Sequence, residues 1–135
     1  MIQINYLAIA VGAVIAVLFS ALYYFLLNKQ VIALRATKLS KKEDVRTVAT
    51  PNKIIIELVR TFVLGLVLAY AVRLLGVATF DQVVVVAFWL WLGFPVVLFV
   101  GQVINEHFPG RLAAIHAGDW LVKLLILVTI LAYWR

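Results

Sequence analysis

The chain has 135 residues, of which 66% are hydrophobic, and a formal net charge of +6. Soluble globular domains contain roughly 45 to 50% apolar residues, so this composition is typical of a membrane protein and excludes an ordinary soluble domain. The positive charge does not indicate nucleic acid binding, because seven of the twelve Lys and Arg residues are confined to residues 28–53. The chain contains no cysteine, which excludes disulfides and thiolate metal sites.

Four apolar runs are long enough to cross a bilayer, for which a helix needs about 20 residues. The spans are predicted at about residues 4–27, 54–75, 83–104 and 112–134. They take up most of residues 1–135, so we expect a single membrane domain that leaves no room for a soluble catalytic core. The predicted fold class is all-α: a polytopic membrane protein with four transmembrane helices in an antiparallel bundle.

The distribution of basic residues predicts the orientation in the membrane. The connection 28–53 carries seven of them, and loops rich in Lys and Arg stay on the cytoplasmic side. This places both ends of the chain outside (N-out and C-out) in a bacterial inner, cytoplasmic membrane. The first apolar run follows no basic segment and exceeds the roughly 7 to 15 residues of a signal-peptide core, so we interpret it as a retained span.

The cytoplasmic loop 28–53 contains two short patterns. Residues 40–43, Ser-Lys-Lys-Glu, have the form of a capping box and predict the start of a short helix. The apolar residues of the stretch 31–34 lie among basic ones, which fits an amphipathic segment resting on anionic headgroups. A straight extension of the first span beyond the membrane explains the same stretch equally well, and the sequence leaves both interpretations open.

Small side chains recur at four-residue spacing in the first two spans. These two small-residue seams consist of Ala8, Gly12, Ala16 and Ser20 in the first span and Thr61, Gly65 and Ala69 in the second. Such seams let helices approach closely, because packing contact rather than hydrophobic drive holds helices together in lipid. We favour packing within one chain over a contact between chains, and we expect the two seams to face each other.

Pro95 lies inside the third predicted span, with Gly93 two residues before it. A proline removes one backbone donor and clashes with the preceding turn, so we expect a kink at this position. Prolines are common in membrane helices, and we favour a structural role over a hinge or a ligand site.

Glu57 lies at the inner end of the second predicted span, four residues after Lys53 and three before Arg60. Both spacings bring side chains together on a helix. We therefore interpret these three residues as an ion cluster at the membrane interface, where long basic side chains extend toward water.

The fourth span carries a polar stripe formed by His116, Asp119 and Lys123, which share one helix face. A charge facing lipid at the centre of a helix costs roughly 2.5 to 3.5 kcal/mol, so these side chains should face protein, water or each other. Asp119 precedes Lys123 by four residues, a favourable spacing for an ion pair. The stripe is either a structural ion pair that holds helices together or a proton or ion relay in a water-accessible cavity, and we slightly favour the former.

His116 lies near the predicted cytoplasmic interface, and two roles are open for it. It is either a titrating partner of Asp119 or a side chain that simply reaches toward the interface, which we favour. Apart from the stripe, the sequence contains no HExxH, no GxSxG and no glycine-rich phosphate loop, and no carboxylates at metal-ligand spacing. We therefore expect no catalytic residue, no metal and no cofactor, and the chain is not predicted to be an enzyme.

Several short motifs together resemble a known family. They are residues 4–8, 23–24, 74–77 (Leu-Leu-Gly-Val), 91–94 (Trp-Leu-Gly-Phe), 115–122 and 131–135. In these motifs the chain is similar to the small bacterial membrane proteins grouped as domain-of-unknown-function family 1761. The resemblance implies four membrane spans and no assigned activity, catalytic residue or cofactor.

The sequence favours a small integral membrane protein of transport type or channel type whose stripe lines a polar cavity. A single four-helix unit has little interior in which to enclose Asp119, Lys123 and both seams, so we expect a homo-oligomer in the lipid bilayer. We expect no nucleic acid partner. The alternative is an accessory subunit that binds other membrane proteins through its seams, with the Asp119 and Lys123 pair only holding helices together.

Overall fold

The structure, a computed structural model, describes residues 1–38 and 50–135. Within these residues every regular element is helical. The elements are α1 (Tyr6–Leu26), α2 (Asn28–Lys38), α3 (Pro51–Leu74), α4 (Phe80–Trp91), the π-helical turn η1 (Leu92–Val96), α5 (Val97–Asn105) and α6 (Gly110–Tyr133). Four stretches are long and apolar enough to cross a membrane, namely α1, α3, α6 and the continuous stretch Phe80–Asn105. The predicted all-α fold with four spans is therefore confirmed.

Local sequence signals set where three of the helices begin. Asn5 precedes α1 and its side chain accepts a hydrogen bond of 3.1 Å from the Ala8 amide. α3 starts with Pro51, whose missing amide costs nothing in a first turn. Thr79 and Gln82 form a capping box at the start of α4. The caps of α1 and α4 satisfy helix-end donors that lipid would leave without partners.

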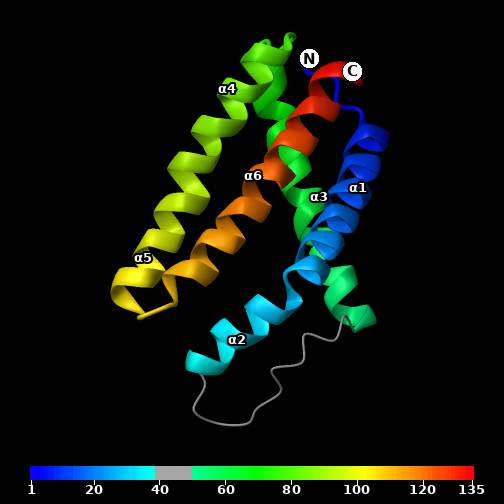
Figure 1. The fold of residues 1–135 in the computed structure, drawn as a ribbon. Helices are drawn as coiled ribbons and strands as arrows, with labels where there is room; N and C mark the ends of the chain where they lie inside the picture. Colours follow the sequence, from blue (N-terminus) through cyan, green and yellow to red (C-terminus); the bar gives the residue numbers. More distant parts are fainter. Residues whose placement is uncertain (39–49) are drawn as a thin grey trace.

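α6 is the central helix of the bundle. It packs against α1, α3 and α4, and it is more buried than the other three spanning stretches. Figure 1 shows α6 running through the middle, with α1 and α3 to one side of it and α4 to the other. Both termini lie at one end of the bundle, and α2 lies at the opposite end. A polar residue on the inward face of α6 is therefore enclosed by protein rather than lipid.

The half of the bundle near the termini is filled by apolar side chains. The buried core there includes residues from the part of each span that lies nearest the termini, namely Ile9, Val72, Val83, Ala87, Leu127, Val128 and Leu131. Close packing of this kind leaves no room for water. The polar groups of the interior therefore gather in the other half, toward α2.

Both small-residue seams are used within the chain, as we favoured. A Cβ atom on Gly12 would lie 3.1 Å from Leu127 of α6, and one on Gly65 would lie 2.8 Å from Ile9 of α1. Ala8, Ala16, Ser20, Thr61 and Ala69 are buried as well. The expectation that the seams face each other is wrong for Gly12, because α6 rather than α3 fills the space in front of it.

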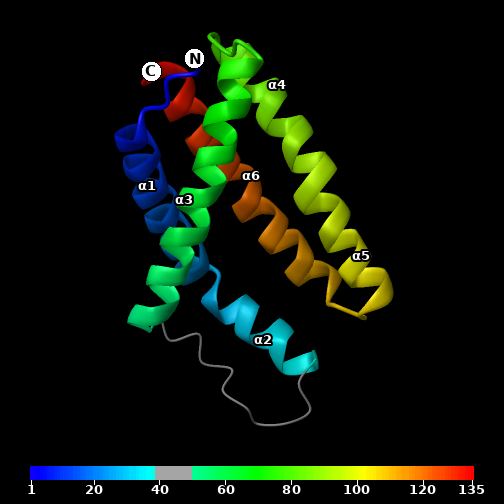
Figure 2. The ribbon, with the colours of Figure 1, turned by 180° about the vertical axis from the view of Figure 1, so that it is seen from behind.

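Pro95 lies in the π-helical turn η1, which joins α4 to α5. A π turn accommodates a residue whose amide cannot donate to the preceding turn, so the expected irregularity takes this form. α4 and α5 follow one another as a single rod in Figures 1 and 2. The irregularity is thus local, and the third span continues through it.

The first part of the connection 28–53 is the helix α2. Leu27, with φ −98° and ψ 9°, separates it from α1. α2 turns away from the α1 axis and packs on α6, as both ribbon views show. The stretch 31–34 is therefore not a straight extension of the first span, and Val31 is buried against the bundle. The capping box at residues 40–43 lies outside the described residues.

Candidate functional site

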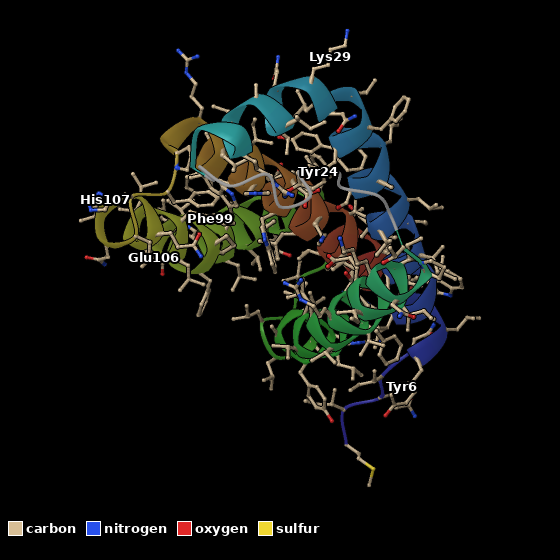
Figure 3. The ribbon with its side chains drawn as sticks, turned by 90° about the horizontal axis from the view of Figure 1, so that it is seen from below. Tyr6, Tyr24, Lys29, Phe99, Glu106 and His107 are labelled. Atoms are coloured by element: carbon tan, nitrogen blue, oxygen red, sulfur yellow. The ribbon has the colours of Figure 1, made fainter. Side chains whose placement is uncertain are left out.

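A cavity of about 650 Å³ lies at the α2 end of the bundle, between α1, α2, α3, α5 and the first half of α6. Its charged lining residues are Arg35, Lys53, Glu57, Arg60, Asp119 and Lys123. Four of these are cationic and two are acidic, and we call this space the basic cavity. Figure 3, which looks at this end of the molecule, shows Tyr24 and Phe99 within the ring of helices and Glu106 and His107 at its edge.

Lys123 lies at the inner limit of the basic cavity and is only 3% exposed. Its Nζ atom is 2.7 Å from Glu57 Oε1 and 3.8 Å from Asp119 Oδ2. Glu57 also accepts a hydrogen bond of 3.1 Å from Arg60. The pairing of Asp119 with Lys123 is therefore real but secondary, because the closer partner of Lys123 comes from α3.

Asp119 is 4% exposed and has partners on both carboxylate oxygens. Ser20 Oγ of α1 donates a hydrogen bond of 2.6 Å to Oδ1, while Oδ2 faces Lys123. A buried charge is tolerated only when it is paired and hydrogen-bonded, and both conditions hold here. Ser20, which the sequence indicated only as a packing residue, thus joins the charged cluster formed by Glu57, Arg60, Asp119 and Lys123.

His116 has a different partner from the one that the sequence suggested. Its Nδ1 atom lies 2.5 Å from the Tyr24 hydroxyl, and its ring packs beside Phe99 and Phe108 at centroid distances of 5.9 and 6.1 Å. The side chain is half-buried in this aromatic group. Neither the pairing with Asp119 nor the free extension toward the interface is observed.

Two further hydrogen bonds attach α6 to its neighbours at the level of the cavity. The Tyr23 hydroxyl donates to the Ile115 carbonyl at 2.8 Å, and Trp91 Nε1 donates to the Ala117 carbonyl at 2.7 Å. Gly118 makes the first contact feasible, since a Cβ atom there would lie 2.7 Å from the Tyr23 oxygen. The segment of α6 that carries the stripe is therefore held from both sides.

The structure thus brings the three stripe residues together with Ser20, Tyr24 and Glu57. The sequence indicated Ser20 for packing and Glu57 for an interfacial ion cluster, and it pointed to Tyr24 as part of a family motif. One signal was present, because Ser20 and Tyr24 are four residues apart on α1 and match Asp119 and His116 on the antiparallel α6. In the described part of the chain, no group of three or more His, Cys, Asp or Glu residues could hold a metal ion.

Fold and site together define a polytopic helical membrane protein with a charged cavity at one end of its bundle. The chain belongs to the family described as "Protein of unknown function (DUF1761)", whose model matches residues 7–132. This confirms the resemblance noted from the sequence motifs. No curated protein and no solved structure matches the chain. The family supplies no activity, so function has to be argued from the cavity.

Proposed function

We propose that this protein is a transport-type membrane protein whose substrate enters the basic cavity from the α2 end. One observation carries the proposal: a cavity of about 650 Å³ reaches a charged cluster formed by the buried Asp119 and Lys123 and the partly exposed Glu57. Sites for small ligands have volumes of roughly 300 to 1,000 Å³. Ionisable groups in a membrane interior are costly and typically mark transport pathways.

The closed state of the other half of the bundle favours a transporter over a channel. Beyond Lys123 the interior contains packed apolar residues such as Leu127 and Val128, both 0% exposed. A channel needs a continuous water path, whereas a transporter exposes its site to one side at a time. The present arrangement fits a transporter whose site is accessible from the α2 end only.

The charged cluster provides alternative partners for a moving group. The Lys123 ammonium has two carboxylates within 4 Å, from α3 and from its own helix. A small shift of α6 against α3 would exchange its preferred partner without leaving a charge unpaired. A purely structural ion pair needs one carboxylate only, so the second carboxylate near Lys123 supports a role in transport.

The alternative role as an accessory subunit loses its main support. Its binding surface was to be the small-residue seams, yet these are buried within one chain. The argument for a homo-oligomer is affected in the same way, because a single chain encloses both Asp119 and Lys123. Assembly into a homo-oligomer remains a prediction.

The orientation also remains a prediction: the positive-inside rule assigns the α2 end to the cytoplasmic side of the inner membrane.

The absence of native cysteines allows a direct test by thiol labelling in membrane vesicles. Ala21→Cys reports on the basic cavity, Val128→Cys on the closed half, and Leu18→Cys on an exposed apolar position that should face lipid. A membrane-impermeant maleimide should label position 21 from the α2 side. For a transporter, position 128 should react from the opposite side as the protein opens there, while position 18 stays unreactive.

Complete protection of position 128 under conditions that label position 21 would argue against transport. Val128→Cys nearly preserves side-chain volume, so the variant should fold. Its folding is checked independently by the melting temperature in detergent. The matched positive control is Val128→Cys labelled after denaturation, which shows that the thiol itself is reactive.

A further inference from the structure

A second, apolar space lies beside the basic cavity, between α5 and α6. It has a volume of about 400 Å³, and we call it the apolar groove. Its α6 wall consists of small residues, Gly110, Ala113, Ala114 and Ala117, which leave the space that larger side chains would fill. α5 packs on α6 less closely than α4 does. The groove is therefore built into the junction that follows the π-helical turn.

The described side chains that line the groove offer no free hydrogen-bonding group. Trp91 carries the one side-chain donor of its lining, and this Nε1 atom donates to the Ala117 carbonyl. The remaining lining side chains are hydrocarbon, including Val96, Val100 and Val103. A polar solute gains nothing in such a space, whereas an alkyl chain gains roughly 0.8 kcal/mol for each buried methylene relative to water.

Phe99 belongs to the lining of both spaces. On one side its ring stacks against His116, which lines the basic cavity, and on the other it borders the apolar groove. The two spaces are therefore neighbours across a single side chain. One ligand that reaches past Phe99 would occupy both.

The charges of the basic cavity specify the polar part of such a ligand. Four cationic side chains face two carboxylates there, which leaves an excess of two positive charges. Glu57 and Asp119 are engaged with Lys123 and Arg60, so among the described residues of the lining the excess resides with Arg35 of α2 and Lys53 of α3. A guanidinium and an ammonium that line one cavity are well suited to bind a phosphate or carboxylate group.

We propose that the basic cavity and the apolar groove form one binding site for an acidic membrane phospholipid. The headgroup phosphate lies between Arg35 and Lys53, and one acyl chain passes Phe99 into the groove between α5 and α6. The lipid comes from the bilayer, since both spaces lie among helices that span it. The conclusion that this lipid is the transported substrate rests on the proposed function. The conclusion that the lipid binds here does not.

The test measures lipid binding to the full-length protein in detergent by native mass spectrometry. Phosphatidylglycerol is compared with phosphatidylcholine carrying the same acyl chains. We expect phosphatidylglycerol to bind more tightly, and glycerol 3-phosphate, which has the headgroup chemistry without the chain, to compete poorly. Arg35→Gln should weaken phosphatidylglycerol binding by roughly tenfold, about the value of one hydrogen bond to a charged group. Ala114→Phe should weaken it by a similar factor, because the ring takes the place of about two buried methylenes of the acyl chain.

Matched controls separate these effects from general damage. Arg73→Gln removes a cation at the far end of α3, and Val67→Phe adds a ring to an exposed position outside both spaces. Both should bind phosphatidylglycerol as the wild type does. Ala114 is exposed in the groove, so Ala114→Phe fills space without breaking the core, which the melting temperature verifies.

Three results would overturn the inference. Equal binding of the two phospholipids would indicate ordinary surrounding lipid, and effective competition by glycerol 3-phosphate would indicate a soluble anion as ligand. Normal binding by Ala114→Phe would remove the groove from the site. The labelling of Val128→Cys is independent of these outcomes. If position 128 is labelled but the protein shows no lipid preference, the protein transports another substrate. If the protein prefers phosphatidylglycerol but position 128 is never labelled, it binds lipid without transporting it.

Discussion

Lys123 of α6 forms its shortest ion pair with Glu57 of α3, at 2.7 Å, although the two residues are 66 positions apart in the sequence. Asp119, one helical turn away on the same helix, is 3.8 Å from the same ammonium. The fourth span is thus tied electrostatically to the second. Because Glu57 lies near the start of α3, the pair links the inner limit of the basic cavity to the end where α2 lies.

Breaking this pair should be costly unless both charges are removed. Removing one partner of a buried ion pair costs about 3 to 5 kcal/mol, because the other charge loses its compensation. Glu57 is partly exposed, so we expect Glu57→Gln to cost less than Lys123→Leu. We expect the double variant Glu57→Gln, Lys123→Leu to be more stable than Lys123→Leu alone. Unfolding in detergent across the double-mutant cycle measures the coupling, which should be on the order of 0.5 to 3 kcal/mol. Strictly additive effects would contradict the pairing.

Ser20→Ala should destabilise the protein, because the Asp119 carboxylate loses a donor at 2.6 Å. Leaving a buried charged acceptor without this partner costs about 1 to 3 kcal/mol. Thr61→Val is the matched control: Thr61 Oγ1 is buried and has no hydrogen-bond partner among the described residues, so its removal should be neutral or stabilising. Thermal unfolding of both variants checks the difference, and an equal loss of stability would contradict the assigned role of Ser20.

Gly65→Ala should destabilise the contact between α1 and α3. The added methyl group would lie 2.8 Å from Ile9 Cγ2, and overpacking of this kind costs about 1 to 3 kcal/mol. Gly101→Ala in α5 meets nothing within 4 Å and should gain up to about 1 kcal/mol of helix propensity. Opposite shifts in melting temperature are expected. A tolerated Gly65→Ala would show that the two helices separate easily at this point.

The number of subunits should not depend on the charged cluster. Asp119 and Lys123 are enclosed by their own chain, so the double variant Asp119→Asn, Lys123→Leu should retain the subunit count of the wild type. Native mass spectrometry in detergent measures both proteins. Dissociation of a wild-type oligomer in the variant, with the monomer still folded, would mean that the cluster also contacts a second copy.

Much of the fold follows directly from the sequence, because hydrophobic runs of spanning length must form helices in a bilayer. The four spanning stretches accordingly lie where the apolar runs are. The path of α2 did not follow in the same way, since the same residues suit an extended first span. The backbone conformation of Leu27 ends α1 and lets α2 take another direction, and no local sequence pattern predicts this conformation.

The composition of the site was only partly readable. The spacing of His116, Asp119 and Lys123 placed them on one face, but which helix faces them depends on tertiary packing. Glu57 was assigned to the interface because its nearest charges in sequence are Lys53 and Arg60. The hydrogen bond of Ser20 to Asp119 could not be predicted, because packing alone accounts for a small residue in a small-residue seam.

The charged cluster also has a consequence for the response of the protein to membrane voltage. Glu57 and Asp119 carry two negative charges, and Arg60 and Lys123 carry two positive ones, so the group is electrically neutral. A displaced elementary charge exchanges about 2.3 kcal/mol with a potential of 100 mV, but a neutral group that moves as a unit exchanges almost none. Movement of this cluster in the empty protein should therefore be nearly indifferent to membrane potential, and a voltage dependence of turnover would report the substrate or charges outside the cluster, such as Arg35 and Lys53.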